Sequence, residues 1–481
     1  MIQTKEFPRR KIGFLLDGQW RCEGEAFDVL APYDGQVVAT TFRGTPEHLN
    51  AAIEAAVRAF ETARRLPSCE RQRVLRAVAE GIAVRQEEIA HTLALEAAKP
   101  IKAARAEVER AVFTFSVAAE ESTRIYGEWL PLDLQTATVG RWAIVRRFPV
   151  GPIASITPFN FPLNLVAHKV APAIAAGCSV VHKPAPQTPI CSLLLGEIVQ
   201  AAGWPNGGLN VLPLSNQEAG PLVTDDRLKM LSFTGSAAVG WELKKRAGKK
   251  RVTLELGGNA GVIVHGDADL AYAATRCVQG AFAYAGQTCI SVQRIFVQRG
   301  VWDRFLAEFV PHVQRLKLGD PLDEATDVGP MISEAAAQRA ARWVEEAVTA
   351  GAHVLCGGNR RGAFMEPTVL TSTSSRQRVN CEEVFAPVVT VESYEDFAEA
   401  VKRVNDSSFG LQAGVFTRDA KLLFEAYDEL QVGGVIVGDV PTFRIDHMPY
   451  GGVKDSGLGR EGLRYAIEEM TERKLLAVNL P

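Results

Sequence analysis

Residues 153–212 read IASITPFNFPLNLVAHKVAPAIAAGCSVVHKPAPQTPICSLLLGEIVQAAGWPNGGLNVL. Short apolar runs at 153–157, 179–182 and 208–212 alternate there with Ala-rich helical stretches at 166–176 and 190–202. Strand and helix in turn, at these lengths, are typical of βαβ units on a parallel sheet. The sequence therefore predicts an α/β fold.

The pattern continues on both sides of this stretch. After it, a second series has a strand at 260–264, a helix to about Tyr284, a strand at 295–297 and a helix from Trp302. We place a domain boundary near Gly257-Gly258 for this reason. Before it, helices are expected at 46–60, 71–95 and 102–126 and a strand at 138–147, and the tail 474–480 reads as a terminal strand.

The first helix has a clear start signal, because Thr45 can cap it and Pro46 suits its first position. Its expected core face consists of Leu49, Ile53, Ala56, Val57 and Phe60. The third helix is amphipathic and rich in Ala and Glu.

Composition excludes several classes of protein. The 481 residues are 47% hydrophobic and 23% charged, which is too much chain for one core. The net charge of −3 comes without a long basic run, so nucleic acid is not an expected partner. Neither a signal peptide nor a membrane span is recognisable, and we expect a cytoplasmic protein. Eight cysteines without a CxxC indicate neither a disulfide framework nor a metal site.

Three segments combine reactive side chains with Gly or Pro: TPFNFP at 157–162, LELGG at 254–258 and GQTC at 286–289. The thiolate of Cys289 would attack a carbonyl carbon well and hold the acyl group between two half-reactions. A free thiol has a pKa of about 8.5 and needs local help to ionise. The alternative, a small core thiol, is less favoured because Gly286 indicates a helix break that brings Cys289 into a cleft.

Two further polar residues fit this chemistry. Glu255 lies alone in an apolar run, and burial would raise its pKa towards that of a useful general base for water. Asn160 could donate to an oxyanion together with the backbone N–H of Cys289. Their alternatives are a carboxylate at a strand end and an Asn that closes a turn before Pro162.

Other segments extend the set: KPA at 183–185, FTGS at 233–236, EEVFAP at 382–387, PYGGVK at 449–454 and Ser456-Gly457. In this order the segments resemble the aldehyde dehydrogenase superfamily, and the likeness runs from about Asp17 to the C-terminus. It implies two parallel-sheet, Rossmann-like domains and a β ribbon for oligomerisation. The expected limits are 1–126 and 146–257 for a discontinuous cofactor domain, 258–470 for a catalytic domain, and 127–145 with 471–481 for the ribbon.

The resemblance also implies a mechanism. Cys289 adds to an aldehyde, Asn160 stabilises the oxyanion, hydride leaves to a nicotinamide, and Glu255 activates water to release the acid. Lys169 and Glu461 match positions that pass the proton to solvent, with a plain ion pair as the alternative. The rivals are transfer of the acyl group to coenzyme A, disfavoured by Glu255, and a non-catalytic binding protein.

NAD or NADP is the implied cofactor, although no GxGxxG motif occurs. The nearest pattern is the glycine turn 235–240, where a helix N-terminus would face the pyrophosphate. The residues expected at the cofactor are Thr157, Pro158, Phe159, Lys183, Pro186, Gly235, Ser236, Gly257, Glu383 and Phe385. Pro186 replaces a Glu that many NAD-preferring members carry, so NADP should be tolerated.

The implied substrate is a small aldehyde, and an anionic one is among the options. Phe161 and Tyr450, with Phe159, match aromatic walls, although aromatic residues there often only pack. Arg444 and Arg110 match anion-binding positions in members that act on lactaldehyde, glyceraldehyde phosphate or phosphonoacetaldehyde, and succinic semialdehyde is a further candidate. For Arg110 a solvated helix face is an equal alternative. Some members that bind phosphorylated aldehydes have a basic residue just before the catalytic Cys, and here that residue is Thr288. The resemblance also implies a homodimer or homotetramer.

Overall fold

The alternating stretch at 153–212 folds into strand–helix units, as its pattern predicts. In the computed structural model, which describes residues 10–479, they are β8 (Ile153–Ile156), α5 (Asn164–Ala176), β9 (Val180–Lys183), α6 (Ile190–Ala201) and β10 (Leu209–Val211). Strand β8 pairs in parallel with β9, and β9 with β10. Every residue of α5 is buried, which explains why its sequence is apolar on all sides.

These strands belong to an eight-stranded sheet with the order β24-β12-β11-β8-β9-β10-β2-β3. Its other members are β2 (Phe14–Leu16), β3 (Gln19–Arg21), β11 (Met230–Thr234), β12 (Arg251–Glu255) and β24 (Gly457–Leu458). The five central strands from β12 to β10 are parallel. Parallel strands end at one edge of a sheet, so the loops after β8, β11 and β12 lie near one another.

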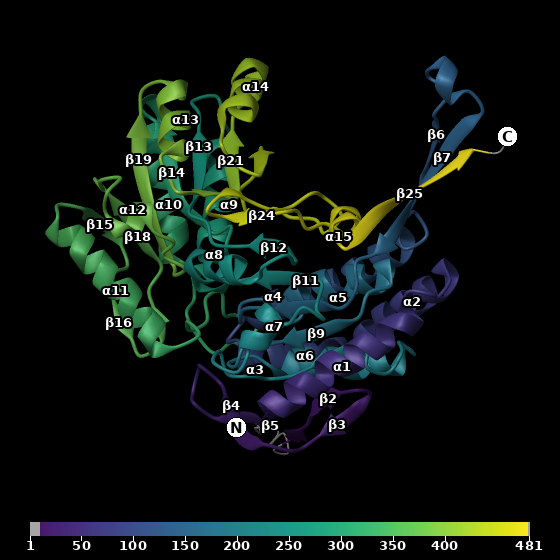
Figure 1. The fold of residues 1–481 in the computed structure, drawn as a ribbon. Coiled ribbons are helices and arrows are strands. Elements are labelled where there is room, and N and C mark those ends of the chain that lie inside the picture. The colour runs from purple at the N-terminus through teal and green to yellow at the C-terminus, as the bar shows by residue number, and fades with distance from the viewer. Residues whose placement is uncertain (1–9, 480–481) are drawn as a thin grey trace.

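Helices cover this sheet, and Figure 1 shows most of the lobe in purple to teal, with α15 in yellow. They are α1 (Pro46–Ala63), α2 (Ser68–Val84), α3 (Gln86–Glu96), α4 (Ile101–Glu121), α7 (Gly220–Thr224), α8 (Ala237–Arg246) and α15 (Leu463–Glu469). A small sheet of β1 (Arg10–Ile12), β5 (Val37–Arg43) and β4 (Glu25–Leu30) lies beside them.

The helix predictions hold in outline and fail in detail. Thr45 caps α1, with Pro46 in its first turn, as predicted. Val57 was wrongly placed on the core face, since it is 37% exposed. The region 71–95 is two helices that meet at Arg85, and α4 ends at Glu121 rather than near Tyr126.

A second lobe, teal to green in Figure 1, is built on a seven-stranded sheet with the order β15-β18-β19-β14-β13-β21-β22. These strands are β13 (Ala260–Val264), β14 (Val292–Gln298), β15 (His353–Cys356), β18 (Thr368–Thr371), β19 (Val388–Tyr394), β21 (Gln412–Phe416) and β22 (Gly434–Val437). The helices are α9 (Leu270–Phe282), α10 (Trp302–Gln314), α11 (Glu334–Thr349), α12 (Arg378–Cys381), α13 (Phe397–Asn405) and α14 (Ala420–Glu429). Two short antiparallel pairs complete it: β16 (Arg360–Arg361) with β17 (Phe364–Met365), and β20 (Phe409–Gly410) with β23 (Val453–Lys454).

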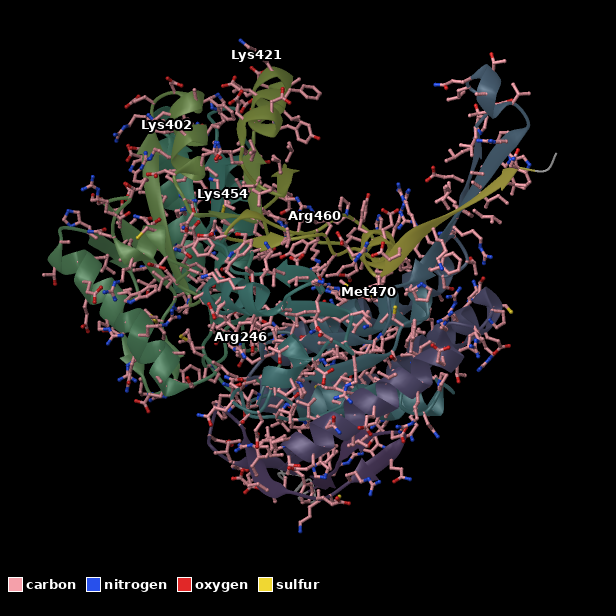
Figure 2. All side chains as sticks on the ribbon, in the orientation of Figure 1. Arg246, Lys402, Lys421, Lys454, Arg460 and Met470 are labelled. Atoms are coloured by element: carbon pink, nitrogen blue, oxygen red, sulfur yellow. The ribbon has the colours of Figure 1, made fainter. Side chains whose placement is uncertain are left out.

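The chain changes sheets between Glu255, at the end of β12, and Ala260, at the start of β13. It returns later, because β24 pairs with β12 and Leu463, Ile467 and Met470 pack into the core of the first lobe. Figure 2 places Arg460 and Met470 on this returning segment, between the second lobe and the ribbon. The last residues of the predicted catalytic domain, up to 470, therefore pack with the first lobe and not with the second. The other predicted domain limits stay predictions.

Three antiparallel strands form a ribbon that projects away from both lobes (Figure 1). They are β6 (Glu128–Pro131), β7 (Arg141–Pro149) and β25 (Thr471–Asn479). Strand β25 pairs with β7 along its whole length. The strand predicted at 138–147 thus begins at Arg141. The predicted cofactor domain starts at residue 1 and the predicted ribbon ends at 481, and their residues 1–9 and 480–481 lie outside the described residues.

A buried ion pair of the first lobe contacts an aromatic ring of the second. The ammonium of Lys99 hydrogen-bonds to Glu107 and lies 3.7 Å from the ring centre of Phe161 and 4.6 Å from that of Tyr284. The other oxygen of Glu107 accepts from the backbone N–H groups of Leu163 and Asn164, where α5 begins. Phe161 precedes α5 in the first lobe and Tyr284 follows α9 in the second.

We expect Lys99→Met to destabilise the fold by about 3 kcal/mol, because it leaves the Glu107 carboxylate buried without its counter-ion. The control is Arg124→Met, which breaks ion pairs of a half-exposed arginine with Glu120 and Glu121 and should cost less than about 1 kcal/mol. Urea unfolding of both variants measures the difference. Equal losses would show that the buried pair carries no special weight.

Candidate active site

The turn that carries Cys289 depends on unusual backbone geometry. Helix α9 ends at Phe282, and Tyr284, Ala285 and Gly286 follow with φ of +51°, +51° and +68°. A Cβ on Gly286 would lie 2.2 Å from the carbonyl oxygen of Ala386, so only glycine fits this close approach. The break predicted at Gly286 is present, and it turns Cys289 away from the helix.

Cys289 opens onto a cavity of about 410 Å³ at the carboxyl ends of β8, β11 and β12. Many of the predicted site residues line it: Arg110, Pro158, Phe159, Asn160, Phe161, Gly235, Ser236, Glu255, Gly257, Glu383, Phe385, Arg444 and Tyr450. Lys169 and Glu461 are buried behind this lining, and Arg444 links Glu461 to it. The structure thus gathers the predicted nucleophile, base and oxyanion donor around one space.

The sulfur of Cys289 lies 3.1 Å from the phenol oxygen of Tyr450. Burial raises the pKa of the Cys289 thiol to about 11, and the contact with Tyr450 opposes that rise. Nearby, the Asn160 amide donates to the carbonyl of Gln287 at 3.0 Å. An amide nitrogen has two hydrogens, so one remains for an oxyanion.

Glu255 is buried at the end of β12, and both of its carboxylate oxygens lack a hydrogen-bond partner among residues 10–479. Burial raises its pKa well above the ordinary value, and the negative charge of Glu461 raises it further. Arg444, Lys169 and Arg460 oppose this rise only in part. Buried polar atoms without partners are rare, and these two oxygens are suited to a water molecule or a reacting group.

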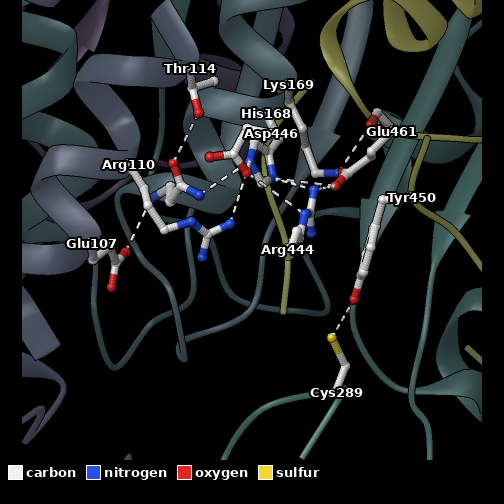
Figure 3. Close-up of polar contacts among 12 residues, drawn as sticks. Glu107, Arg110, Thr114, His168, Lys169, Cys289, Arg444, Asp446, Tyr450 and Glu461 are labelled. Atoms are coloured by element: carbon white, nitrogen blue, oxygen red, sulfur yellow. Dashed lines mark hydrogen bonds and ion pairs between the residues drawn. The ribbon is translucent and has the colours of Figure 1, made fainter. Parts of the chain in front are cut away.

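Glu461 has the opposite environment (Figure 3). One oxygen lies 3.4 Å from Lys169 Nζ, and the other lies 2.9 Å from an Arg444 nitrogen and 3.3 Å from His168 Nδ1. Burial alone would raise the pKa of Glu461, but these neighbours lower it below the usual range. The surroundings thus favour the charged form of Glu461 and the neutral form of Glu255.

Asp446 organises the two predicted anion-binding arginines (Figure 3). Its carboxylate contacts Arg110 and His168 at 2.8 Å each and Arg444 at 3.7 Å. Despite burial, His168, Arg110 and Arg444 lower its pKa below the ordinary range. The Nε atoms of both arginines are buried without a hydrogen-bond partner in the described part of the chain. Internal carboxylates thus hold each guanidinium at the wall of the cavity.

Several of the residues predicted to bind NAD or NADP lie close together in the lining of the cavity. Glu383 accepts from the Gly258 N–H at 3.0 Å, and burial raises its pKa to about 7. A Cβ at Gly257 would come within 2.4 Å of this carboxylate. The ring of Phe385 meets that of Phe159 edge-on at 5.9 Å.

The predicted phosphate end of the cofactor site contains polar groups without a hydrogen-bond partner in the described residues. The hydroxyl of Thr234 is buried in the cavity wall with no partner within residues 10–479, and α8 begins just after Ser236. Free N–H groups at such a helix start suit a phosphate.

The adenosine side of the predicted site lies apart from the cavity of Cys289. Burial alone lowers the pKa of Lys183 to about 8. Pro186 is exposed and lines a neighbouring groove with Glu96 and Gln187. Thr157 is buried directly after β8.

Sequence reasoning missed three residues of the site. His168 lines the cavity and lies one turn after Asn164, 3.1 Å away, and this i, i+4 spacing beside Lys169 was a usable signal. Asp446 follows Arg444 by two positions and could have been paired with it. Arg339 of α11 lines the cavity near Glu383, and no local pattern marks it.

Comparison with known proteins decides the family. The model of the aldehyde dehydrogenase family matches residues 20–476. The chain belongs to this family. It is an aldehyde dehydrogenase, an oxidoreductase that acts on aldehydes, and the predicted fold class is confirmed by its structural neighbours.

Three relatives show how close the match is. The 3-sulfolactaldehyde dehydrogenase of Priestia aryabhattai is 44% identical over 98% of both chains. The crystal structure of aldehyde dehydrogenase 21 from Physcomitrella patens, in complex with the reaction product succinate, is 46% identical with a TM-score of 0.97, covering 98% of this chain and 99% of that one. The glyceraldehyde-3-phosphate dehydrogenase GapN from Methanocaldococcus jannaschii, complexed with NADP, is 39% identical with a TM-score of 0.91, covering 96% and 100%.

The prediction of NAD or NADP agrees with the family, whose solved members include NADP and NAD forms. Across residues 10–479, no helix combines the length and hydrophobicity that a bilayer span needs. The roles of individual site residues stay predictions.

The environment of Glu255 predicts a pH dependence. A base must be ionised, and a raised pKa moves the growth of the ionised fraction above the ordinary carboxyl range, so kcat should still increase as the pH rises beyond that range. Glu461→Gln removes a charge that raises this pKa and should move the rise to lower pH. Steady-state rates across the pH range give both curves. Superimposable curves would exclude coupling between the two carboxyl groups.

Proposed function

We propose that this chain oxidises a short aldehyde with a terminal anionic group to the carboxylic acid, by hydrolysis of a thioester on Cys289. The observation that carries the proposal is the shared cavity, which Cys289, Asn160 and Glu255 line together with Arg110 and Arg444. The first three residues are suited to acyl chemistry, and the two arginines to an anion.

Cys289 is the proposed nucleophile and Asn160 the proposed oxyanion donor. Attack of the thiolate on the aldehyde carbon gives a negatively charged oxygen. The free hydrogen of Asn160 Nδ2 and the backbone N–H of Cys289 are then the donors that stabilise it. The Gln287 carbonyl keeps the amide in place beforehand, so little reorganisation is needed during the reaction.

Glu255 is the proposed base for the second half-reaction. The bound nicotinamide supplies the two-electron acceptor, and the acyl group remains on Cys289 as a thioester. Glu255 takes a proton from water, which attacks the thioester and frees the acid. Glu461, held by Lys169 and Arg444, is the proposed next proton acceptor towards solvent.

The anionic substrate is supported by the basic side chains at this part of the cavity. Arg110 and Arg444 line it, and internal carboxylates hold both, Asp446 for Arg110 and Glu461 for Arg444. A guanidinium is suited to the oxygens of a carboxylate or sulfonate. Relatives named for sulfolactaldehyde, or bound to succinate, handle short molecules of this charge.

For the cofactor we propose that Glu383 and Phe385 hold the nicotinamide ribose side, with Gly235 and Ser236 at the phosphates and Lys183 at the adenosine ribose. Pro186 offers no carboxylate to repel a 2′-phosphate. NADP should therefore be accepted at least as well as NAD.

The proposed function is tested by NAD(P)H absorbance with a panel of aldehydes: succinic semialdehyde, 3-sulfolactaldehyde, lactaldehyde and butanal, each with NAD and with NADP. We expect turnover without coenzyme A, a higher kcat/KM for the anionic aldehydes, and no turnover in Cys289→Ser with cofactor binding retained. A requirement for coenzyme A would favour the acylating alternative. Inactivity with every aldehyde would favour the binding protein.

The role of Arg110 has its own test. Arg110→Met should raise KM for succinic semialdehyde about tenfold to a hundredfold, the value of one or two charge-assisted contacts, and change KM for butanal little. Arg105→Met is the matched control, because Arg105 lies on the same helix and pairs with Glu87 and Glu324 instead. An equal loss for both aldehydes would contradict an anion-binding role.

We also propose that the ribbon mediates oligomerisation. Trp129, Leu475 and Leu476 are 63%, 54% and 61% exposed on it, an unusual concentration of apolar surface in a projecting element. Burial against a second copy in a dimer or tetramer would remove it from water. The cytoplasmic location stays a prediction.

A further inference from the structure

Tyr450 contacts the reacting atom of the site. Its phenol oxygen is 3.1 Å from Cys289 Sγ, and the residue is 3% exposed (Figure 3). Burial raises the pKa of Tyr450 well above its ordinary value, so the phenol keeps its proton. A protonated phenol beside a thiolate can only donate to it. The sequence predicted an aromatic wall here, which does not account for the position of the hydroxyl.

Two sets of contacts fix the ring in this position. The Arg444 guanidinium lies 3.6 Å from its centre, within the range of a strong cation–π contact. The backbone of Tyr450 exchanges hydrogen bonds with that of Glu461, at 3.1 Å and 2.6 Å. Glu461 also pairs with Arg444 at 2.9 Å. The three residues form a closed unit that holds the hydroxyl at the sulfur.

We propose that Tyr450 is a catalytic residue that donates its phenol hydrogen to the Cys289 thiolate, and that Arg444 positions and polarises it for this purpose. The inference deepens the proposed function and rests on it for the identity of the nucleophile. The donated hydrogen is not transferred: it stabilises the negative sulfur before attack, and the bond weakens once the sulfur becomes bonded to carbon.

The expected benefit follows from thiol chemistry. A hydrogen bond that lowers a thiol pKa by about one unit increases the thiolate about tenfold below that pKa. Intrinsic nucleophilicity falls at the same time by about threefold. The net gain is about threefold, and it matters here because burial otherwise suppresses the thiolate of Cys289.

Alkylation by iodoacetamide, followed at the Cys289 peptide by mass spectrometry from pH 7 to 10.5, tests the proposal on the full chain. Peptide resolution is needed because Cys22 and Cys69 are also exposed. In Tyr450→Phe we expect alkylation about threefold slower than in the wild type throughout this pH range, because the pKa of the Cys289 thiol lies above it in both proteins. Tyr394→Phe, which removes another buried phenol hydroxyl, bonded to His265, is the control and should react as wild type.

An unchanged or faster alkylation of Cys289 in Tyr450→Phe overturns the proposal and leaves Tyr450 as a wall of the cavity. If aldehyde turnover stays normal in that case, the proposed function still stands. Inactivity of the wild type with every aldehyde would overturn the proposed function, whatever the alkylation shows.

Arg444→Lys separates positioning from charge, since lysine keeps the charge and loses the flat face that stacks on the ring. We expect a smaller slowing than in Tyr450→Phe, and no further slowing when the two changes are combined. Additive effects would show that Arg444 acts on the sulfur independently and would overturn its assigned role.

Discussion

The Lys99 ammonium between the rings of Phe161 and Tyr284 is the contact on which the site depends. Asn160 comes from the loop that Phe161 belongs to, in the eight-stranded lobe, and Cys289 follows Tyr284 in the seven-stranded lobe. The proposed oxyanion donor and the proposed nucleophile thus come from different lobes. The buried cation, with Glu107 and the start of α5, holds the two loops together, and the hydrogen bond from Asn160 to Gln287 completes the junction.

Near that junction, the neighbours of two glutamate side chains shift their pKa values in opposite directions. Glu255 has partnerless oxygens and is driven towards the neutral form, whereas Glu461 is surrounded by Lys169, Arg444 and His168 and stays ionised. A site needs such a difference to move a proton in one direction. Arg444 contacts both groups of residues, because it pairs with Glu461 and stacks on the ring of Tyr450, whose hydroxyl contacts Cys289.

Local pattern was enough to predict much of the fold. Alternation of strands and helices predicted both parallel sheets, and Thr45-Pro46 marked the start of α1. The errors have local causes: Val57 fits a helical period but points outward, and Arg85 breaks a region that is helical on either side. The return of residues 457–470 to the first lobe depends on long-range packing that no local pattern encodes.

The residues that line the cavity were predictable where chemistry and motif coincide, as at Cys289, Glu255 and Asn160. It was not predictable where a residue acts through a distant partner. Lys99 is separated by 62 positions from Phe161 and Asp446 by 336 positions from Arg110, so neither pairing leaves a trace in local sequence. Tyr450 was recognised as aromatic, but the position of its hydroxyl is a tertiary property.

The central claim is that a covalent acyl group forms on Cys289 and that Glu255 is needed for its hydrolysis. The most direct measurement is the intact mass of Glu255→Gln after mixing with succinic semialdehyde and cofactor, with peptide mapping of any adduct. We predict an added acyl mass on Cys289 that persists in Glu255→Gln and is short-lived in the wild type. An unmodified Cys289 in a variant that still turns over at the wild-type rate would contradict the account.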